Sequence, residues 1–98
     1  MIVKVHHKGE KTIVAACDTK LLGQKFEEND IVLDLSSPYY AGEEKDEGET
    51  GDLLRNADVC NLVGEKSTQL ALKEGLISKA NILRCQGIPF AQAVIIRD

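Results

Sequence analysis

The stretch Ile2–Cys17, IVKVHHKGEKTIVAAC, predicts two short strands joined by a two-residue turn at Gly9-Glu10. Glycine at the first central position suits a type II′ turn, whose twist matches that of paired antiparallel strands. This turn sets a register in which Val5 faces Val14 and Ile2 faces Cys17. The expected core side carries Val3, Val5, Val14 and Ala16; the mixed, partly exposed side carries Ile2, Lys4, His6, Ile13, Ala15 and Cys17.

Outward from this hairpin, Asp18 is placed to cap a short helical turn over residues 19–22, which Gly23 would end. Residues 27–30 form a polar cluster typical of a turn. The alternation that follows, at residues 31–35, predicts a third strand.

Two helices are expected in the second half of the chain. Thr50 would cap a helix of about two turns over residues 52–57. A clearer helix is predicted at 65–74, because Gly75 suits the left-handed residue that closes a helix. Further strands are predicted at 59–63, 81–86 and 91–97, with the last two joined across Gly87-Ile88-Pro89.

The order of elements predicts an α+β fold in which strands lead, helices lie in the middle and hairpins bracket them. We expect a two-layer sandwich: a mostly antiparallel or mixed sheet of about six strands, with two helices on one face. The 98 residues, 43% of them hydrophobic, suffice for one core, so residues 1–98 are expected to form a single domain.

Composition favours a cytoplasmic protein. No apolar run approaches the ~20 residues that cross a bilayer, and the first residues lack the pattern of a signal peptide. The three cysteines are far apart and include no CxxC pair, which favours free thiols in a reducing compartment.

The net charge of −4 is unevenly distributed. Residues 26–58 are strongly acidic, and residues 41–51 are expected to form a mobile loop or an acidic lid. Both ends of the chain are basic. If the ends meet in space they would form a basic face that attracts an anionic partner. The N-terminal lysines are Lys4, Lys8, Lys11, Lys20 and Lys25.

A cysteine nucleophile is the sharpest hypothesis of enzymatic chemistry. A thiolate at Cys17 would need a base such as His6 within hydrogen-bond reach. The predicted register separates the two by ~13 Å along the hairpin, which favours Cys17 as an inert apolar filler. A zinc site is equally unsupported, because Cys17, Cys60, Cys85 and His6 lie on separate strands instead of in close pairs. We expect no metal and no cofactor.

Polar residues next to predicted strands give weaker signals. The step from strand to helix at Asn61–Glu65 would expose N–H groups to a phosphate, yet no nucleotide fingerprint is present and helix capping explains it better. Gln92 lies among apolar residues and would either bind a ligand or tie down a turn. One of Tyr39 and Tyr40 would either stack on a base or partner, or pack over the sheet edge.

Several motifs taken together are specific: Ala15-Ala16-Cys17-Asp18 followed by Leu21–Phe26, then Tyr39-Tyr40-Ala41-Gly42-Glu43, Asn61–Glu65 and Gly87–Gln92. On these motifs the chain resembles a small archaeal family of domains of unknown function over nearly its whole length. The resemblance implies a two-layer domain in an archaeal cytoplasm, no assigned reaction, and a loose association with translation. Members typically have His where this chain has Phe90. The ligand-binding candidates that the resemblance implies are Cys17, Asp18, Tyr40, Gly42, Asn61, Gly64 and Gln92.

Three functional hypotheses follow. The first is a non-catalytic module that binds RNA or a ribonucleoprotein through the N-terminal lysines and an exposed Tyr40. The second is a protein-interaction or self-associating module whose acidic segment 43–52 meets a basic partner. The third is an enzyme with a site near Cys17, Asn61 and Gln92.

Overall fold

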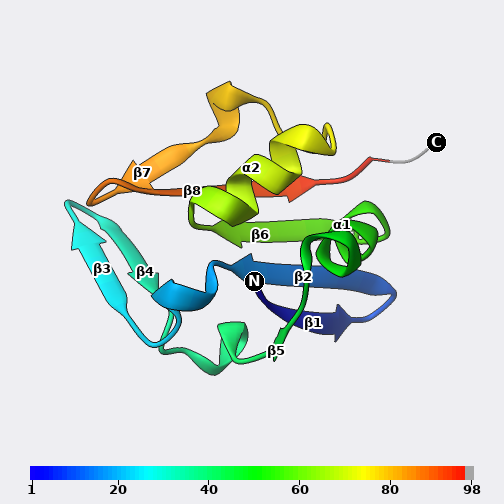
Figure 1. The fold of residues 1–98 in the computed structure, drawn as a ribbon, viewed down its shortest axis with the longest axis horizontal. Helices are drawn as coiled ribbons and strands as arrows, with labels where there is room; N and C mark the ends of the chain where they lie inside the picture. Colours follow the sequence, from blue (N-terminus) through cyan, green and yellow to red (C-terminus); the bar gives the residue numbers. More distant parts are fainter. Residues whose placement is uncertain (97–98) are drawn as a thin grey trace.

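The computed structural model describes residues 1–96 and contains a six-stranded mixed sheet with two α-helices packed against it (Figure 1). The order of strands across the sheet is β5-β1-β2-β6-β8-β7. Neighbouring strands are antiparallel except β2 and β6, which run parallel. The predicted α+β fold is therefore confirmed. The strands are β1 (Ile2–Lys8), β2 (Lys11–Cys17), β5 (Glu43–Glu44), β6 (Val59–Val63), β7 (Leu83–Cys85) and β8 (Ile88–Val94).

The β1–β2 hairpin has the register that its turn predicts. Val5 pairs with Val14 and Ile2 with Cys17, and Gly9 adopts the φ of +61° that the first central residue of a type II′ turn requires. The mixed side is more buried than expected. Ile2 is only 7% exposed and Cys17 is fully buried, because a second layer of structure covers that end of the hairpin.

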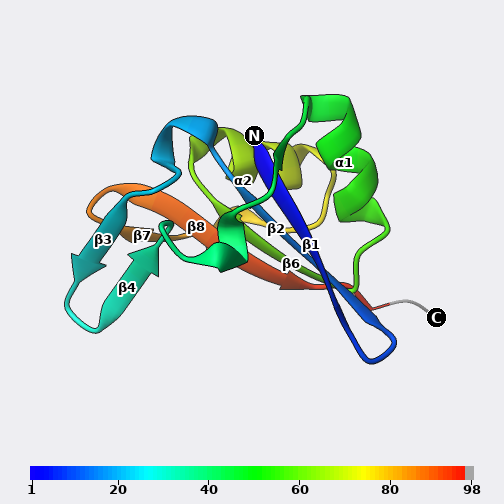
Figure 2. The ribbon, with the colours of Figure 1, turned by 90° about the horizontal axis from the view of Figure 1, so that it is seen from below.

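The main hydrophobic core lies between the sheet and the helices α1 (Glu47–Arg55) and α2 (Glu65–Lys73). Figure 2 shows both helices on the same side of the sheet. Alternate strand residues point toward them, so that Val14 and Leu62 pack against Leu54 of α1 and Leu70 of α2. Burial of this apolar layer, at about 25 cal/mol per Å², is the dominant favourable contribution to folding.

A smaller hydrophobic cluster lies on the opposite side of the sheet, at one end. A separate two-stranded hairpin, β3 (Lys25–Glu28) and β4 (Ile31–Asp34), covers it. The strand at β4 was predicted; β3 was not, because Glu27 and Glu28 were assigned to a turn that in fact comprises Asn29 and Asp30. The buried members of this second cluster are Ile2, Cys17, Leu21, Leu33, Leu35, Val63 and Cys85.

Residues 41–51, predicted to form a mobile loop or an acidic lid, instead form regular structure over most of their length. The segment follows a 3-10 turn (Pro38–Tyr40), forms β5 and then enters α1, which begins at Glu47 instead of at residue 52. Asp46 caps α1 in a capping box with Glu49, so these carboxylates lie where the helix dipole favours negative charge. Thr50 is not a cap: it is buried within the helix, and its hydroxyl donates to the Asp46 carbonyl at 2.8 Å.

The helix predicted at 65–74 is confirmed as α2. Its end is closed by hydrogen bonds from Gly75 N–H to the Leu72 carbonyl and from Leu76 N–H to the Ala71 carbonyl. Asp18, by contrast, does not cap the 3-10 turn that follows it (Thr19–Leu21). Its side chain points across the fold instead, as described below.

The C-terminal hairpin turns earlier than predicted. Gln86 and Gly87, with φ of +51° and +78°, form the turn between β7 and β8. Pro89 lies inside β8, where its carbonyl accepts the N–H of Gly64 at 2.8 Å. The first part of the predicted strand 81–86 is taken up by a 3-10 turn (Lys79–Asn81), and Arg97 of the predicted strand 91–97 lies outside the described residues.

Candidate functional site

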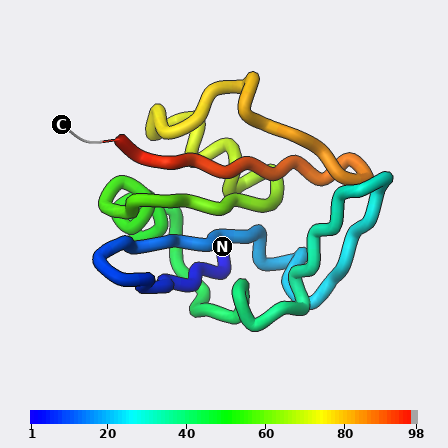
Figure 3. The backbone as a smooth tube through the Cα atoms, turned by 180° about the vertical axis from the view of Figure 1, so that it is seen from behind, coloured from blue at the N-terminus to red at the C-terminus, as the bar shows by residue number. Residues whose placement is uncertain are grey.

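Within residues 1–96, one face of the sheet carries no α-helix. Seen from behind, β1, β2, β6 and β8 run side by side with the β3–β4 hairpin along one end only (Figure 3). The strand register determines which side chains these strands direct to that side. We call this surface the open face; it comprises Lys4, His6, Lys8, Lys11, Ile13, Ala15, Val59, Asn61, Gln92 and Val94.

Tyr39 lies across the open face. Its ring stacks on the ring of His6 in β1, with centroids 4.3 Å apart and an interplanar angle of 12°. The His6 Nε2 atom is also 2.9 Å from the Tyr39 carbonyl oxygen. The 3-10 turn that positions Tyr39 is set by Pro38 and by the Ser37 hydroxyl, which accepts the Tyr39 N–H.

The hydroxyl of Tyr39 reaches the middle of the sheet. It accepts a hydrogen bond of 2.6 Å from the side-chain amide of Asn61 in β6. Because His6 is on β1 and Asn61 on β6, Tyr39 spans β2, and the fully buried Ala15 lies on the same side of that strand. The open face therefore has an ordered aromatic and amide centre.

Asn61 and Gln92 are direct neighbours across β6 and β8. The bonds from Gly64 N–H to the Pro89 carbonyl and from Ile95 N–H to the Asp58 carbonyl alternate with this pair, which makes it a non-hydrogen-bonded pair. Side chains are closest at such positions, with Cα atoms ~4.5 Å apart. The two carboxamides therefore project side by side from the sheet.

The charge of the open face differs from that of the whole protein. Among the residues of β1, β2, β6 and β8, none of the side chains directed to this face is acidic. Lys8 and Lys11 face each other beside the turn between β1 and β2, and Lys4 lies on the same side nearer the start of β1. Carboxylates lie instead on the helices, on β5 and on the β3–β4 hairpin, so the four strands direct only positive charge to this face although the protein has a net charge of −4.

The other two N-terminal lysines lie elsewhere. Lys20 belongs to the turn after β2, and Lys25 belongs to β3, where its ammonium group pairs with Glu27 at 3.2 Å. Of the five predicted lysines, three therefore lie on the open face, and the other two lie in the turn after β2 and in β3.

Asp18 and Gly64 have structural roles. The buried carboxylate of Asp18 accepts the backbone N–H of Lys66 at 3.0 Å and both the N–H and the hydroxyl of Ser67 at 2.9 Å. These bonds cap α2 and occupy the N–H groups that a phosphate would need. Gly64 has a φ of +110°, and a Cβ there would collide with the Asp18 carboxylate.

Gly42 is explained by a close approach of two backbones. A Cβ at this position would collide with the carbonyl of Val3, beside which the chain enters β5. The residue is needed for the pairing of β5 with β1, which does not depend on a ligand.

Cys17 and Tyr40 belong to the second hydrophobic cluster. Burial, with a smaller effect of Asp18, raises the pKa of the Cys17 thiol to about 11. Burial also raises the pKa of Tyr40 to about 12. Cys17 is thus a protonated thiol buried beneath other side chains, whereas Gln92 is exposed. The hypothetical enzyme site at Cys17, Asn61 and Gln92 therefore does not form one accessible cluster. Phe90 packs against the second hydrophobic cluster.

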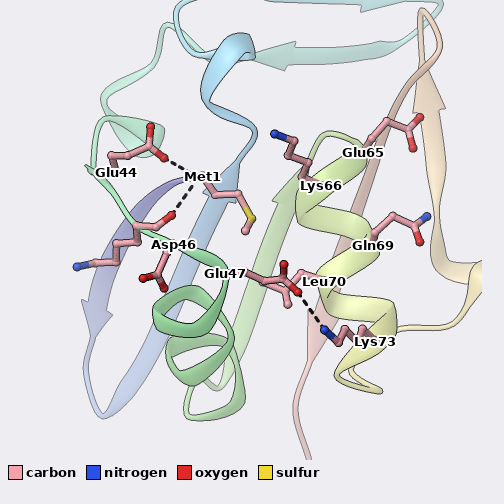
Figure 4. A pocket seen from close by; sticks show the side chains of 10 residues that line it. Met1, Glu44, Asp46, Glu47, Glu65, Lys66, Gln69, Leu70 and Lys73 are labelled. Atoms are coloured by element: carbon pink, nitrogen blue, oxygen red, sulfur yellow. Dashed lines mark hydrogen bonds and ion pairs between the residues drawn. The ribbon is translucent and has the colours of Figure 1, made fainter.

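The acidic segment 43–52 is largely engaged within the chain. Glu43 pairs with Lys45, Glu47 with Lys73, and Asp52 with Arg55, while Asp46 and Glu49 form the capping box. A groove of about 880 Å³ beside it, between the start of α1 and α2, has Met1 and Leu70 among its apolar contacts (Figure 4). Carboxylates and lysines alternate around this groove, so it lacks the one-signed charge of the open face.

Two further kinds of site are not found in the part of the chain that the structure describes. No three His, Cys, Asp or Glu side chains within residues 1–96 are placed to hold a metal ion. No helix in this range has the length and apolar character needed to span a bilayer.

Comparison with known proteins gives a family and a fold. Residues 5–96 match the family model described as "Protein of unknown function (DUF424)". A crystal structure of an uncharacterized conserved protein from the archaeon Methanopyrus kandleri superposes with a TM-score of 0.83 and 23% sequence identity, covering 99% of this chain and 93% of that one. No curated protein matches the chain.

Sequence reasoning did not select the two aromatic residues at the centre of the open face. The sequence patterns favour Tyr40 over Tyr39 and indicate His6 only as a base for Cys17 or as a zinc ligand. The signals were present in Ser37-Pro38, which starts the turn that aims Tyr39, and in the register that puts His6 on the same side as Asn61.

Proposed function

The chain belongs to the DUF424 family of proteins of unknown function, and we propose from its own geometry that it is an RNA-binding module that holds a single-stranded segment on the open face. The observation that carries this proposal is the absence of any carboxylate among the side chains that β1, β2, β6 and β8 direct to that face, although the protein as a whole is acidic.

The lysines supply the electrostatic part of the proposed binding. Lys4, Lys8 and Lys11 project from the same side of the hairpin, where they would contact phosphates of one strand. Each phosphate that is neutralised releases counterions, so the affinity should fall as salt rises. The carboxylates of the helices lie on the other side of the sheet, and charges more than ~10 Å apart are largely screened at 0.1 M salt.

The centre of the face supplies contacts suited to unstacked bases. Open sheet faces that bind single strands combine aromatic rings, on which bases stack, with nearby hydrogen-bonding groups. Here the stacked rings of His6 and Tyr39 and the amides of Asn61 and Gln92 provide both. The proposed target in the cell is an RNA of the translation machinery, which the family resemblance suggests.

The test is fluorescence anisotropy with a labelled single-stranded RNA of mixed sequence at two salt concentrations. We expect the double variant Lys8→Gln/Lys11→Gln to bind more weakly at low salt. If both lysines contact phosphates, the negative slope of log affinity against log salt concentration should become shallower by about 1.4. The control is Lys66→Gln/Lys73→Gln, which removes the same charge from α2 on the opposite side of the sheet.

An unmodified protein that shows no salt-sensitive binding at low salt would refute the proposal. Equal losses of RNA affinity in the two double variants would also refute the proposal. They would show that binding depends on the net charge of the protein and does not depend on the open face.

A further inference from the structure

Resting on this proposed function, we infer that Asn61 and Gln92 form a base-reading pair that favours adenine at one position of the bound strand. Both side chains stand in the middle of the open face, on neighbouring strands, at the pair where side chains approach most closely. The inference concerns which base is recognised, whereas the lysines would bind any sequence.

The hydrogen-bonding capacity of the two amides is only partly used. Asn61 donates one N–H to the Tyr39 hydroxyl, so its carbonyl oxygen and second N–H remain available. Gln92 is exposed, and within residues 1–96 its side chain makes no hydrogen bond. An exposed amide between the buried Ala91 and Ala93 is not required by the core.

A carboxamide presents a donor and an acceptor in one plane. Adenine presents the complementary pair, an amino donor beside a ring nitrogen acceptor, and bidentate contact of Asn or Gln with adenine is a common means of recognition. The site also suits a neutral base because no charged side chain adjoins the pair across the sheet. Next to Asn61 lies Ala15 of β2, and the first charged residue beyond it is Lys4 of β1.

Aliphatic side chains next to the pair would support the ring of the base. Val59 and Val94 face each other on the same strands, two residues from Asn61 and Gln92. Val94 is 68% exposed, which leaves an apolar surface beside the amides. A base whose edge meets the amides would cover this surface and remove it from water.

The experiment compares the affinities of labelled oligomers of adenosine, uridine and cytidine for the 98-residue chain at one low salt concentration. We expect the unmodified protein to bind the adenosine oligomer about 10-fold more tightly than the others. Gln92→Ala should reduce this difference to within about 2-fold, because the adenosine oligomer should lose more affinity than the uridine oligomer. Gln69→Ala, the same change at an exposed position of α2, should keep the full preference.

Asn61→Ser tests the other member of the pair. The urea midpoint of each variant is measured to check that the fold is retained. Equal affinities of the unmodified protein for the three oligomers would overturn the base-reading pair and leave the RNA-binding module standing. A preference that Gln92→Ala and Asn61→Ser do not change, or a preference for another base, would overturn it as well. No salt-sensitive binding of any oligomer would refute the module itself.

Discussion

The carboxylate of Asp18, at the end of β2, accepts the backbone N–H and the hydroxyl of Ser67, each at 2.9 Å, and so caps a helix that begins far along the chain. The motif residues Asp18 and Gly64 therefore belong to one structural unit that joins β2, β6 and α2. Both are buried, and neither offers a free group to a ligand.

Loss of the Asp18 cap should destabilise the fold. We expect Asp18→Ala to lower the free energy of unfolding by about 2–3 kcal/mol, because it leaves buried donors without partners. The measurement is urea denaturation followed by circular dichroism. Asp46→Ala removes the exposed cap of α1 and should cost only about 1 kcal/mol, so a larger loss at Asp46 would contradict this assignment.

Gly64 should tolerate no side chain while Asp18 is present. Gly64→Ala is expected to cost more than about 2 kcal/mol, because its φ of +110° is unfavourable for alanine and the new methyl group meets the Asp18 carboxylate. In the Asp18→Ala background the same change should cost at least about 1 kcal/mol less, since the collision is removed. Strictly additive losses in the double variant would show that the two positions are independent.

Gly42 and Gly48 form a matched pair of glycines in the same acidic segment. Gly42→Ala should destabilise by about 2–4 kcal/mol, since its methyl group collides with the Val3 carbonyl and displaces β5. Gly48 lies in the first turn of α1, where alanine meets nothing closer than a side-chain oxygen at 3.5 Å. There Gly48→Ala should be neutral or stabilise by about 0.5–1 kcal/mol. Thermal unfolding of the two variants measures the contrast, and equal effects would argue against the close approach at Gly42.

The tyrosine pair allows the hydroxyl of Tyr39 to be tested without loss of a ring. Tyr39→Phe should cost about 0.5–1.5 kcal/mol, because the Asn61 amide loses its acceptor. Tyr40→Phe should change stability less, since among the described residues its hydroxyl has no hydrogen bond and its ring keeps its place in the second cluster. Urea midpoints of both variants measure the difference, and a larger loss at Tyr40 would contradict it.

The Cys17 thiol should resist alkylation in the folded protein. Its pKa of about 11 leaves almost no thiolate at pH 7.5, and the side chain is fully buried. Mass spectrometry after treatment with iodoacetamide should find Cys17 unmodified until urea unfolds the chain. Rapid labelling of Cys17 in the folded state would contradict this prediction and support a role for Cys17 as a nucleophile.

The same thiol gives stability a dependence on alkaline pH. Because its pKa is raised from 9.0 in the unfolded chain to about 11 in the fold, its contribution to stability is complete below pH 9 and is lost as the pH rises from 9 to about 11. Cys17→Ala should flatten this part of the curve of unfolding free energy against pH. An unchanged curve would assign the alkaline loss to other groups.

Local sequence patterns predicted the elements whose signals lie within a few residues. The Gly9-Glu10 turn determined the register of β1 and β2, and α2 was delimited by Gly64 and Gly75. The same reasoning placed the start of α1 too late, because it treated the carboxylates at 46–49 as a solvated loop although they are favoured at a helix N-terminus. Strand β3 was missed because its polar residues lack alternation.

Sequence alone determined that this chain forms an α+β sheet protein with its candidate polar residues on strands and turns, because hydrophobic period and turn chemistry act over short distances. Only the tertiary structure decided which of those residues meet. In the folded chain Asp18 caps α2, and Cys17 is buried beneath the β3–β4 hairpin. Four polar or aromatic residues lie together on one face: His6, Tyr39, Asn61 and Gln92. Such neighbours are set by the parallel pairing of β2 with β6 and by the packing of distant segments, which no local pattern records.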